Sequence, residues 1–295
     1  MNGGFVLRAI QGLIESVFNN KTGQIMIIKI GKSLFFLLLC TTLIATNMVY
    51  ADRQESDDER MINDPRVQHR SYVFEATGEE IPYALFVPSS YDPDQPTPMI
   101  LSLHGLGRSY DWLMGYDEYL NYAEEGGFIV ATALGYIRRG WYGTQPLDDP
   151  EDANYSEQDV MNVLSLVRDE FNVDDNRIYL WGHSMGGAGT FHLAKKHPDL
   201  WAAIAVAAPA PRASQSPDDL ELFQHMPVLV IHGDDDQTVP VDVSRSWVTR
   251  MEELGMQHLY VEVAGGDHSL IVSQTPKNMK KIVDFFNITR KHYRQ

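Results

Sequence analysis

Short apolar segments alternate with longer segments of helical period along most of this chain. The short runs are rich in valine, isoleucine and tyrosine, which favours strands, whereas the longer ones repeat apolar residues every three to four positions. This alternation predicts an α/β fold with a mostly parallel eight-stranded sheet and helices on both faces. The predicted strands are Tyr72–Ala76, Ile81–Val87, Met99–Leu103, Phe128–Ala133, Arg177–Trp181, Ala202–Ala207, Val228–His232 and Leu259–Val263. The predicted helices are Trp112–Glu125, Glu157–Phe171, Met185–Lys196, Asp218–His225, Val241–Leu254 and Pro276–Tyr293.

The connections between these elements follow two patterns. A short turn at Thr77-Gly78-Glu79 separates the first two strands and predicts an antiparallel hairpin, whereas the other strands are spaced as strand–helix–strand units. Two connections, Leu134–Tyr155 and Pro209–Asp218, exceed the usual length of about 2–6 residues. We expect them to line a site, and the modest length of the second leaves no room there for a large lid domain.

The N-terminal 51 residues carry a targeting signal. Lys29 and Lys32 precede the apolar stretch Leu34–Ala45, and a small-residue site ending at Ala51 follows. This order is typical of a secretory signal peptide, and the apolar stretch is shorter than the about 20 residues that a membrane span needs. Residues 1–51 are therefore predicted to be an extension and signal peptide cleaved after Ala51, with Met26 as an alternative start. An uncleaved anchor is the alternative interpretation.

The remainder of the chain divides into a lead-in and one folded domain. Asp52–Arg66 is charged and has little apolar surface to bury, so residues 52–70 are expected to be flexible. Residues 71–295 are long enough, in a chain that is 44% apolar, to form a single domain with a substantial core. We expect this domain to be secreted or periplasmic, without stable membrane insertion.

Charge and cysteine content exclude several functions. The formal net charge of −16 disfavours a nucleic-acid partner, because an acidic surface repels phosphate backbones. The single cysteine, Cys40, allows neither an intrachain disulfide nor a multi-cysteine metal site. No sequence feature indicates an oligomeric state.

The segment Tyr179–Gly187 carries the clearest chemical motif. It runs from an apolar strand into Gly182-His183-Ser184-Met185-Gly186 and then into a helical segment. A serine at such a strand-to-helix turn is held in a strained conformation that exposes its hydroxyl, and the flanking glycines avoid collisions with neighbouring elements. Ser184 is therefore the candidate nucleophile, with a glycine-rich helix entry as the purely structural alternative.

Two backbone amides are candidates for an oxyanion hole. The N–H of Met185 lies at the expected N-terminus of the helix, where it can face developing negative charge. A second apolar strand ends in His104-Gly105-Leu106-Gly107, and the N–H of Leu106 is the candidate for the second donor. We expect His104 to brace this loop by hydrogen bonding rather than to act as a base.

A candidate acid and a candidate base follow two later strands. Asp236 lies just past the strand Val228–His232 and three residues before Val239. Ligands of open parallel sheets bind at this edge, which favours Asp236 as the orienting acid, with Asp234 as the fallback and a solvated turn or weak cation site as the structural alternative. His268 follows the last strand in a glycine-containing loop, and a neutral imidazole can accept the serine proton.

The order Ser184, Asp236, His268 along the chain is that of the α/β-hydrolases. The sequence resembles this superfamily from about Tyr72 to the C-terminus, and within it the polyhydroxybutyrate-depolymerase, feruloyl-esterase and prolyl-oligopeptidase-like groups. The resemblance rests on Leu103–Gly105, Val173–Gly187, Gly233–Pro240 and Gly266–His268. It implies an α/β-hydrolase fold, a Ser184–His268–Asp236 triad and a small-molecule ester substrate.

The resemblance leaves the substrate open. A peptidase with the same triad and a catalytically silent binding protein are the alternatives to an esterase. Tyr136, Trp141 and Tyr142 are candidates for stacking on a substrate group, and packing in the core is an equal alternative. Arg138 and Arg139 are expected to face solvent rather than a substrate carboxylate. Since the mechanism needs only side chains and water, no metal or organic cofactor is implied.

Overall fold

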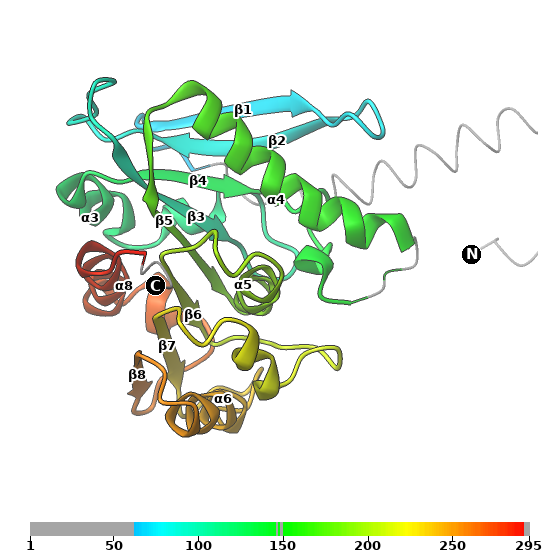
Figure 1. The fold of residues 1–295 in the computed structure, drawn as a ribbon, viewed down its shortest axis with the longest axis vertical. Coiled ribbons are helices and arrows are strands. Elements are labelled where there is room, and N and C mark those ends of the chain that lie inside the picture. The colour runs from blue at the N-terminus through cyan, green and yellow to red at the C-terminus, as the bar shows by residue number, and fades with distance from the viewer. Residues whose placement is uncertain (1–61, 146, 148–149, 292–295) are drawn as a thin grey trace, which may run out of the picture. The chain divides into compact units, whose positions relative to one another are not determined.

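The computed structural model describes residues 62–291, apart from 146, 148 and 149 (Figure 1). The predicted extension and signal peptide at 1–51 and most of the predicted lead-in lie outside the described residues. Within the described part, no helix combines the length and the apolar character that crossing a membrane requires.

A single eight-stranded sheet organises this part of the chain, with the strand order β1-β2-β4-β3-β5-β6-β7-β8. β1 pairs with β2 and β2 with β4 in antiparallel fashion, whereas every later pair is parallel. The predicted hairpin and the predicted mostly parallel sheet are therefore both confirmed. The strands are β1 Val67–Val73, β2 Glu80–Phe86, β3 Thr97–Leu103, β4 Ile129–Ala133, β5 Val173–His183, β6 Ala203–Ala207, β7 Val228–Gly233 and β8 His258–Val263.

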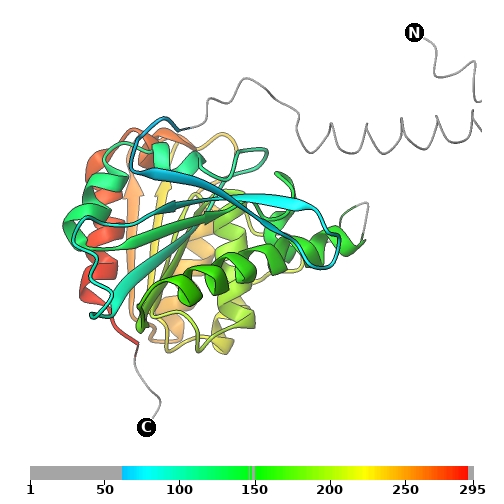
Figure 2. The same cartoon turned by 90° about the horizontal axis from the view of Figure 1, so that it is seen from above.

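Helices cover both faces of the sheet (Figures 1 and 2). Side chains of α4, α5 and α6 pack in one core cluster, and those of α3, α7 and α8 pack in the other. Alternate residues of β5 serve the two clusters, since Leu180 faces the first and Trp181 the second, which is the period-two pattern of a strand buried on both faces. The helices are α3 Tyr119–Gly126, α4 Pro150–Glu170, α5 Met185–Lys196, α6 Asp242–Glu253, α7 Leu270–Ser273 and α8 Pro276–Ile288, with 3-10 turns η1 Trp112–Gly115, η2 Trp141–Gly143 and η3 Pro217–Leu222.

Two predictions in the first half of the chain were wrong: the start of the first strand and the extent of the first helix. β1 begins at Val67, so residues 67–70 of the predicted lead-in belong to the sheet. The mostly polar sequence of this edge strand gave no apolar signal, because only one face of it is covered. The predicted helix Trp112–Glu125 is broken into η1 and α3, since Tyr116 is extended and Glu118 adopts a left-handed conformation with φ 64°.

Three helix predictions differ in length. α4 begins at Pro150 rather than Glu157, and its first turn carries Glu151 and Asp152, which favour a helix N-terminus. The predicted helix Asp218–His225 is the shorter turn η3. α8 ends at Ile288 rather than Tyr293, because Thr289 is extended and its hydroxyl donates to the carbonyl of Phe285.

Candidate active site

The turn between β5 and α5 holds Ser184 in a strained backbone conformation. Its φ of 58° and ψ of −115° are outside the regions that L-residues usually occupy. Hydrogen bonds fix the turn on both sides, since the Ser184 N–H donates to the Ala207 carbonyl at 2.9 Å and its carbonyl accepts from Ala188 and Ala210. This conformation presents the hydroxyl at the carboxyl edge of the sheet, as the motif predicts.

Glycines make this turn sterically possible. A Cβ at Gly182 would lie 2.2 Å from the backbone of Gly186, and a Cβ at Gly186 would lie 1.9 Å from the Leu103 carbonyl oxygen. These clashes are with backbone atoms, which have no room to move between β3, β5 and α5. Close packing of these three elements, and not local flexibility, therefore requires glycine at both positions.

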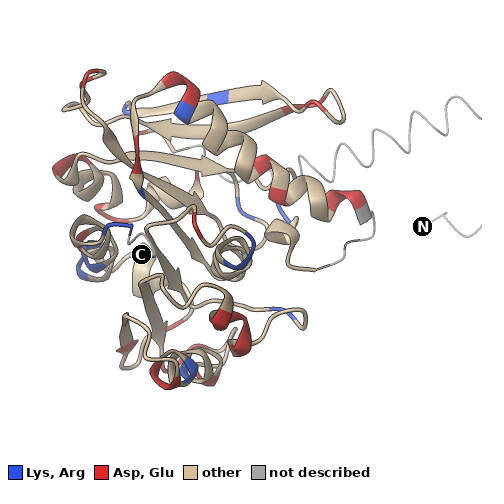
Figure 3. Cartoon of the chain, in the orientation of Figure 1, with Lys and Arg blue, Asp and Glu red and all other residues tan. Residues whose placement is uncertain are grey.

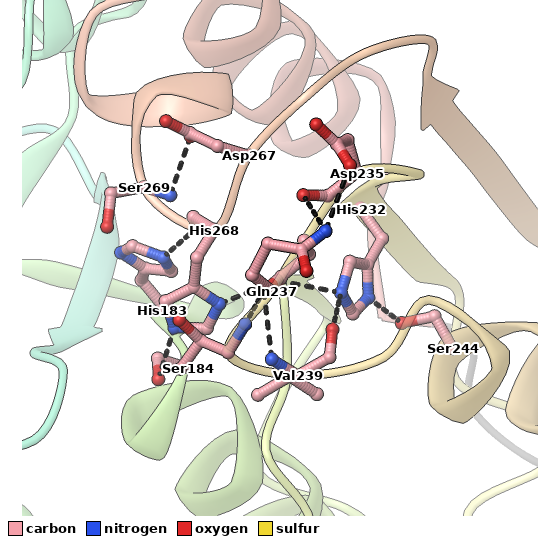
Figure 4. Close-up of polar contacts among 12 residues, drawn as sticks. His183, Ser184, His232, Asp235, Gln237, Val239, Ser244, Asp267, His268 and Ser269 are labelled. Atoms are coloured by element: carbon pink, nitrogen blue, oxygen red, sulfur yellow. Dashed lines mark hydrogen bonds and ion pairs between the residues drawn. The ribbon is translucent and has the colours of Figure 1, made fainter.

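The hydroxyl, the imidazole and the carboxylate predicted from the sequence form a hydrogen-bonded row (Figure 4). Ser184 Oγ lies 2.8 Å from His268 Nε2, and His268 Nδ1 lies 2.6 Å from Asp236 Oδ2. Because a carboxylate can only accept, Nδ1 carries the proton and Nε2 is left to accept from the serine hydroxyl. The row comes from the ends of β5, β7 and β8.

Asp236 is buried and receives four N–H donors. Its Oδ1 accepts from the amides of Thr238 and Val239 at 2.7 and 2.8 Å, and its Oδ2 accepts from His268 and His232. Burial alone would raise the pKa of Asp236, but the Val239 amide and the other donors outweigh it and lower that pKa. The carboxylate is thus held ionised behind His268.

His232, at the end of β7, is a partner of Asp236 that the sequence prediction missed. Its Nε2 lies 3.0 Å from Asp236 Oδ2 and 3.0 Å from the Val239 carbonyl, and its Nδ1 lies 2.6 Å from Ser244 Oγ. Since the carbonyl can only accept, Nε2 carries the proton and Nδ1 accepts from the serine. Burial lowers the pKa of His232, which favours this neutral form.

His183 forms a second support for His268. Its Nε2 lies 2.8 Å from the His268 carbonyl oxygen, and its Nδ1 lies 2.6 Å from Tyr116 Oη. The carbonyl requires a proton on Nε2, so Nδ1 accepts from the tyrosine. Burial, followed by the charge of His268, lowers the pKa of His183 to about 4. The break between η1 and α3 has a role here, because it places Tyr116 beside this ring.

The two residues whose amides are predicted to bind the oxyanion lie on different elements and differ in the exposure of their side chains. Met185 is the first residue of α5, and its side chain is buried. Leu106 follows β3, and its side chain is exposed beside the pocket above Ser184. Among the backbone hydrogen bonds of the described residues, neither N–H is a donor, which leaves both able to bind an oxyanion.

His104 braces the loop that carries Leu106, as expected. The ring is buried, and its two nitrogens lie 2.7 and 2.8 Å from the carbonyl oxygens of Gly105 and Leu134. It thereby ties the segment after β3 to the segment after β4.

Asp234, the alternative candidate for the orienting acid, does not contact His268. Its exposed carboxylate accepts a hydrogen bond from the Gly265 amide at 2.6 Å.

A pocket of about 560 Å³ opens above Ser184, a volume in the usual range for small-molecule sites. Its wall includes Trp141, one of the three predicted stacking residues. It also includes several residues that the sequence prediction missed because none of them belongs to a chemical motif: Arg108, Trp112, Tyr116 and Arg212.

Tyr136 and Tyr142, for which substrate stacking and core packing were equal alternatives, pack in the core. Tyr136 is 2% exposed, and its ring packs 4.9 Å from that of Phe74. Tyr142 is fully buried and lies against Gly135 and Gly189, where a Cβ at either glycine would be 2.6 Å from its ring. Both rings therefore follow the packing alternative, whereas Trp141, which shares their positive φ, lines the pocket.

A comparison with protein families identifies the fold. The model of the Esterase family, described as "Putative esterase", matches residues 75–268. The chain belongs to this family. A crystal structure of a thermostable esterase is 25% identical, with a TM-score of 0.60 over 77% of this chain and 64% of that one. The predicted α/β-hydrolase fold is thus confirmed.

Curated relatives match part of the chain. A bifunctional acetylxylan esterase/xylanase, XynS20E, from Neocallimastix patriciarum is 26% identical over 52% of this chain and 21% of its own length. Feruloyl esterase B from Thermothelomyces thermophilus is 29% identical over 41% of this chain and 42% of its own length. The chain therefore spans less than half the length of these relatives.

Proposed function

We propose that this protein is a serine hydrolase that cleaves carboxylic esters through an acyl-serine intermediate. The observation that carries the proposal is the row Ser184–His268–Asp236, in which the protons are placed for attack by the serine oxygen. Membership of the Esterase family and similarity to an acetylxylan esterase and a feruloyl esterase support an ester substrate.

The reaction follows from this placement of protons. Ser184 Oγ attacks the ester carbonyl carbon while its proton moves to His268 Nε2, and the amides of Leu106 and Met185 bind the resulting oxyanion. Collapse breaks the carbon–oxygen bond of the ester, and His268 returns the proton to the departing alkoxide. Water then attacks the acyl-serine and gives a proton to His268, which passes it to Ser184 Oγ as the acyl carbon–Oγ bond breaks and the carboxylic acid leaves. Asp236 stabilises the imidazolium in both halves.

We also propose that the enzyme acts outside the cytoplasm. The support is the order of basic residues, apolar stretch and small-residue site before Asp52. Sequencing the N-terminus of the protein made in its native host tests this directly. A mature chain that begins at Asp52 is expected, and a chain that retains residues 27–51 would contradict it.

A substrate panel tests the catalytic proposal. We expect purified protein to hydrolyse p-nitrophenyl and feruloyl esters with a higher kcat/KM than prolyl or aminoacyl amides. Ser184→Ala should lower ester kcat/KM at least about 10³-fold, because only oxyanion and binding interactions survive. The thermal unfolding profile of the variant should match that of the wild type. An unchanged rate in Ser184→Ala would defeat the mechanism, and faster cleavage of the amides would favour a peptidase.

A further inference from the structure

Two arginines line the pocket above Ser184. Arg108 follows β3 and Arg212 follows β6, and both side chains are exposed at the pocket. Among the described residues that line this pocket there is no Asp or Glu. The charged side chains that a substrate meets there are therefore the two guanidinium groups.

Each guanidinium is held by a tryptophan. The Arg108 guanidinium carbon lies 4.3 Å from the ring centroid of Trp112, and that of Arg212 lies 4.5 Å from the ring centroid of Trp141. Such stacking uses the face of the planar group and leaves its N–H donors, which lie in the plane, at the edge. These donors match the two oxygens of a carboxylate.

The stacked arrangement of Arg212 has further support. Its Nε donates to Gln145 Oε1 at 2.6 Å, and no described residue accepts from its Nη atoms. The guanidinium is thus held by an aromatic face and one hydrogen bond, and Arg212 lines the pocket. A solvent-facing arginine that only contributes to solubility needs neither support.

The charge of these residues contrasts with the rest of the molecule. The chain has a net charge of −16, and Asp and Glu positions are spread over α4 and α6 (Figure 3). A positive pocket in an acidic protein concentrates anions at that place and repels cations. The positive charge of Arg108 also acts on a residue of the site. After burial and the charge of His268, it is a further cause of the low pKa of His183.

We propose that the ester cleaved at Ser184 carries a carboxylate, which Arg108 or Arg212 binds while the scissile carbonyl occupies the oxyanion site. The inference rests on the proposed esterase function and goes beyond it by naming the substrate class. It differs from the expectation for Arg138 and Arg139, which are not among the residues lining this pocket. Both the acyl and the alcohol portion of an ester can carry the carboxylate, and two substrate pairs separate these cases.

The first experiment compares each anionic ester with a neutral isostere. Methyl 4-carboxybenzoate and methyl 4-carbamoylbenzoate place the group on the acyl side, and 4-carboxyphenyl acetate and 4-carbamoylphenyl acetate place it on the alcohol side. Each kcat/KM is divided by the rate of alkaline hydrolysis of the same ester. We expect the anionic member of at least one pair to be preferred by about 10-fold, which corresponds to about 1.4 kcal/mol, because a guanidinium binds a carboxylate through charge-assisted hydrogen bonds. High salt should reduce this preference.

The second experiment assigns the preference to the arginines. Arg108→Gln and Arg212→Gln are measured separately, and at least one should lower the anionic-to-neutral ratio about 5-fold or more. Arg212→Lys should retain part of the ratio, because it keeps the charge but loses the planar stack. Arg168→Gln on α4 is the matched control, since it removes the same charge from a surface ion pair with Asp175 and should leave the ratio unchanged.

Several outcomes would overturn the inference. A ratio of one or below in both pairs would show that the pocket does not select a carboxylate. The same conclusion follows if neither arginine variant changes the ratio, or if Arg168→Gln changes it equally. If the neutral esters are hydrolysed without an anionic preference, only this inference fails. If wild-type protein cleaves none of the esters, the proposed function itself fails.

Discussion

The polar side chains on the two sides of Ser184 are held in different ways. Behind His268, buried groups form a closed network in which every proton has one acceptable position: Asp236 accepts from His268 and His232, and His183 donates to the His268 carbonyl. Such a network fixes geometry before substrate arrives.

The pocket side has no comparable network. Its arginines are exposed, and their guanidinium groups stack on Trp112 and Trp141. Exposed, stacked guanidinium groups can contact a ligand directly, whereas the buried network acts on the reaction through His268. We infer that the buried side determines the reaction and that the pocket side determines which ester reacts.

The largest expected effect is on the buried side. Asp236→Asn should lower kcat by about 10³–10⁴-fold, because the amide can donate to His268 Nδ1 and thereby favour the wrong tautomer. Steady-state kinetics on a neutral ester measure this. Asp234→Asn is the control, since Asp234 is exposed and contacts Gly265 rather than His268, and its activity should stay within about 3-fold of the wild type. Equal losses in both variants would refute the distinction.

The buried network should also respond to pH. The pKa of His183 is about 4 in the folded protein against an ordinary value of 6.5, so between these values the unfolded chain holds more protons and stability falls as pH falls. At pH 4.5 this amounts to about 2.5 kcal/mol. Between pH 7.5 and 4.5, the unfolding free energy of wild type should drop by about that much more than that of His183→Gln.

Urea unfolding of the two proteins at both pH values provides the measurement. Asp159 acts in the opposite direction, because burial raises its pKa to about 6, which favours the folded state as pH falls. Its contribution is the same in wild type and variant and cancels in the difference. An equal drop in both proteins would mean that His183 is not held neutral.

A smaller effect is expected at His232. His232→Phe removes one of the four N–H donors to Asp236, so we expect kcat to fall about 10-fold with little change in KM. His232→Gln offers an amide donor and should recover part of this loss. The acidic limb of the kcat profile should move to higher pH in His232→Phe. A loss confined to KM, or no recovery in His232→Gln, would argue against a positioning role.

Proximity of the buried groups could be predicted from the sequence because each follows a strand. Ser184, Asp236 and His268 come just after β5, β7 and β8, and parallel strands bring such positions to one edge of the sheet. The supporting histidines were missed, since His232 lies in an apolar strand and His183 occupies a position of the motif that tolerates any residue. Only tertiary packing turns their rings toward Asp236 and His268.

The residues that line the pocket could not be predicted from the sequence, because they too are brought together only by tertiary packing. Arg108 and Arg212 are about one hundred residues apart and lie on loops with no periodic pattern, so nothing local indicates that they share a pocket. For the aromatic residues of the long loop, the sequence left stacking on substrate and packing in the core as equal alternatives. All three aromatic residues have positive φ, so neither residue type nor local backbone distinguishes the buried Tyr136 and Tyr142 from the pocket-lining Trp141.

The smallest expected effect tests this orientation. The ring of Tyr136 packs in the core cluster with Phe74, and its hydroxyl donates to Glu79. Tyr136→Phe removes this hydroxyl, so the unfolding free energy should fall by about 1 kcal/mol while kcat/KM stays within about twofold. Trp141→Ala, in contrast, removes a pocket wall and the support of Arg212, and should change the anionic-to-neutral ester ratio at least about 3-fold. Parallel urea unfolding and ester kinetics on both variants separate the two roles. If Tyr136→Phe changed the ester ratio as much as Trp141→Ala, the buried ring would belong to the pocket side after all, and the division between a reacting side and a selecting side would not hold.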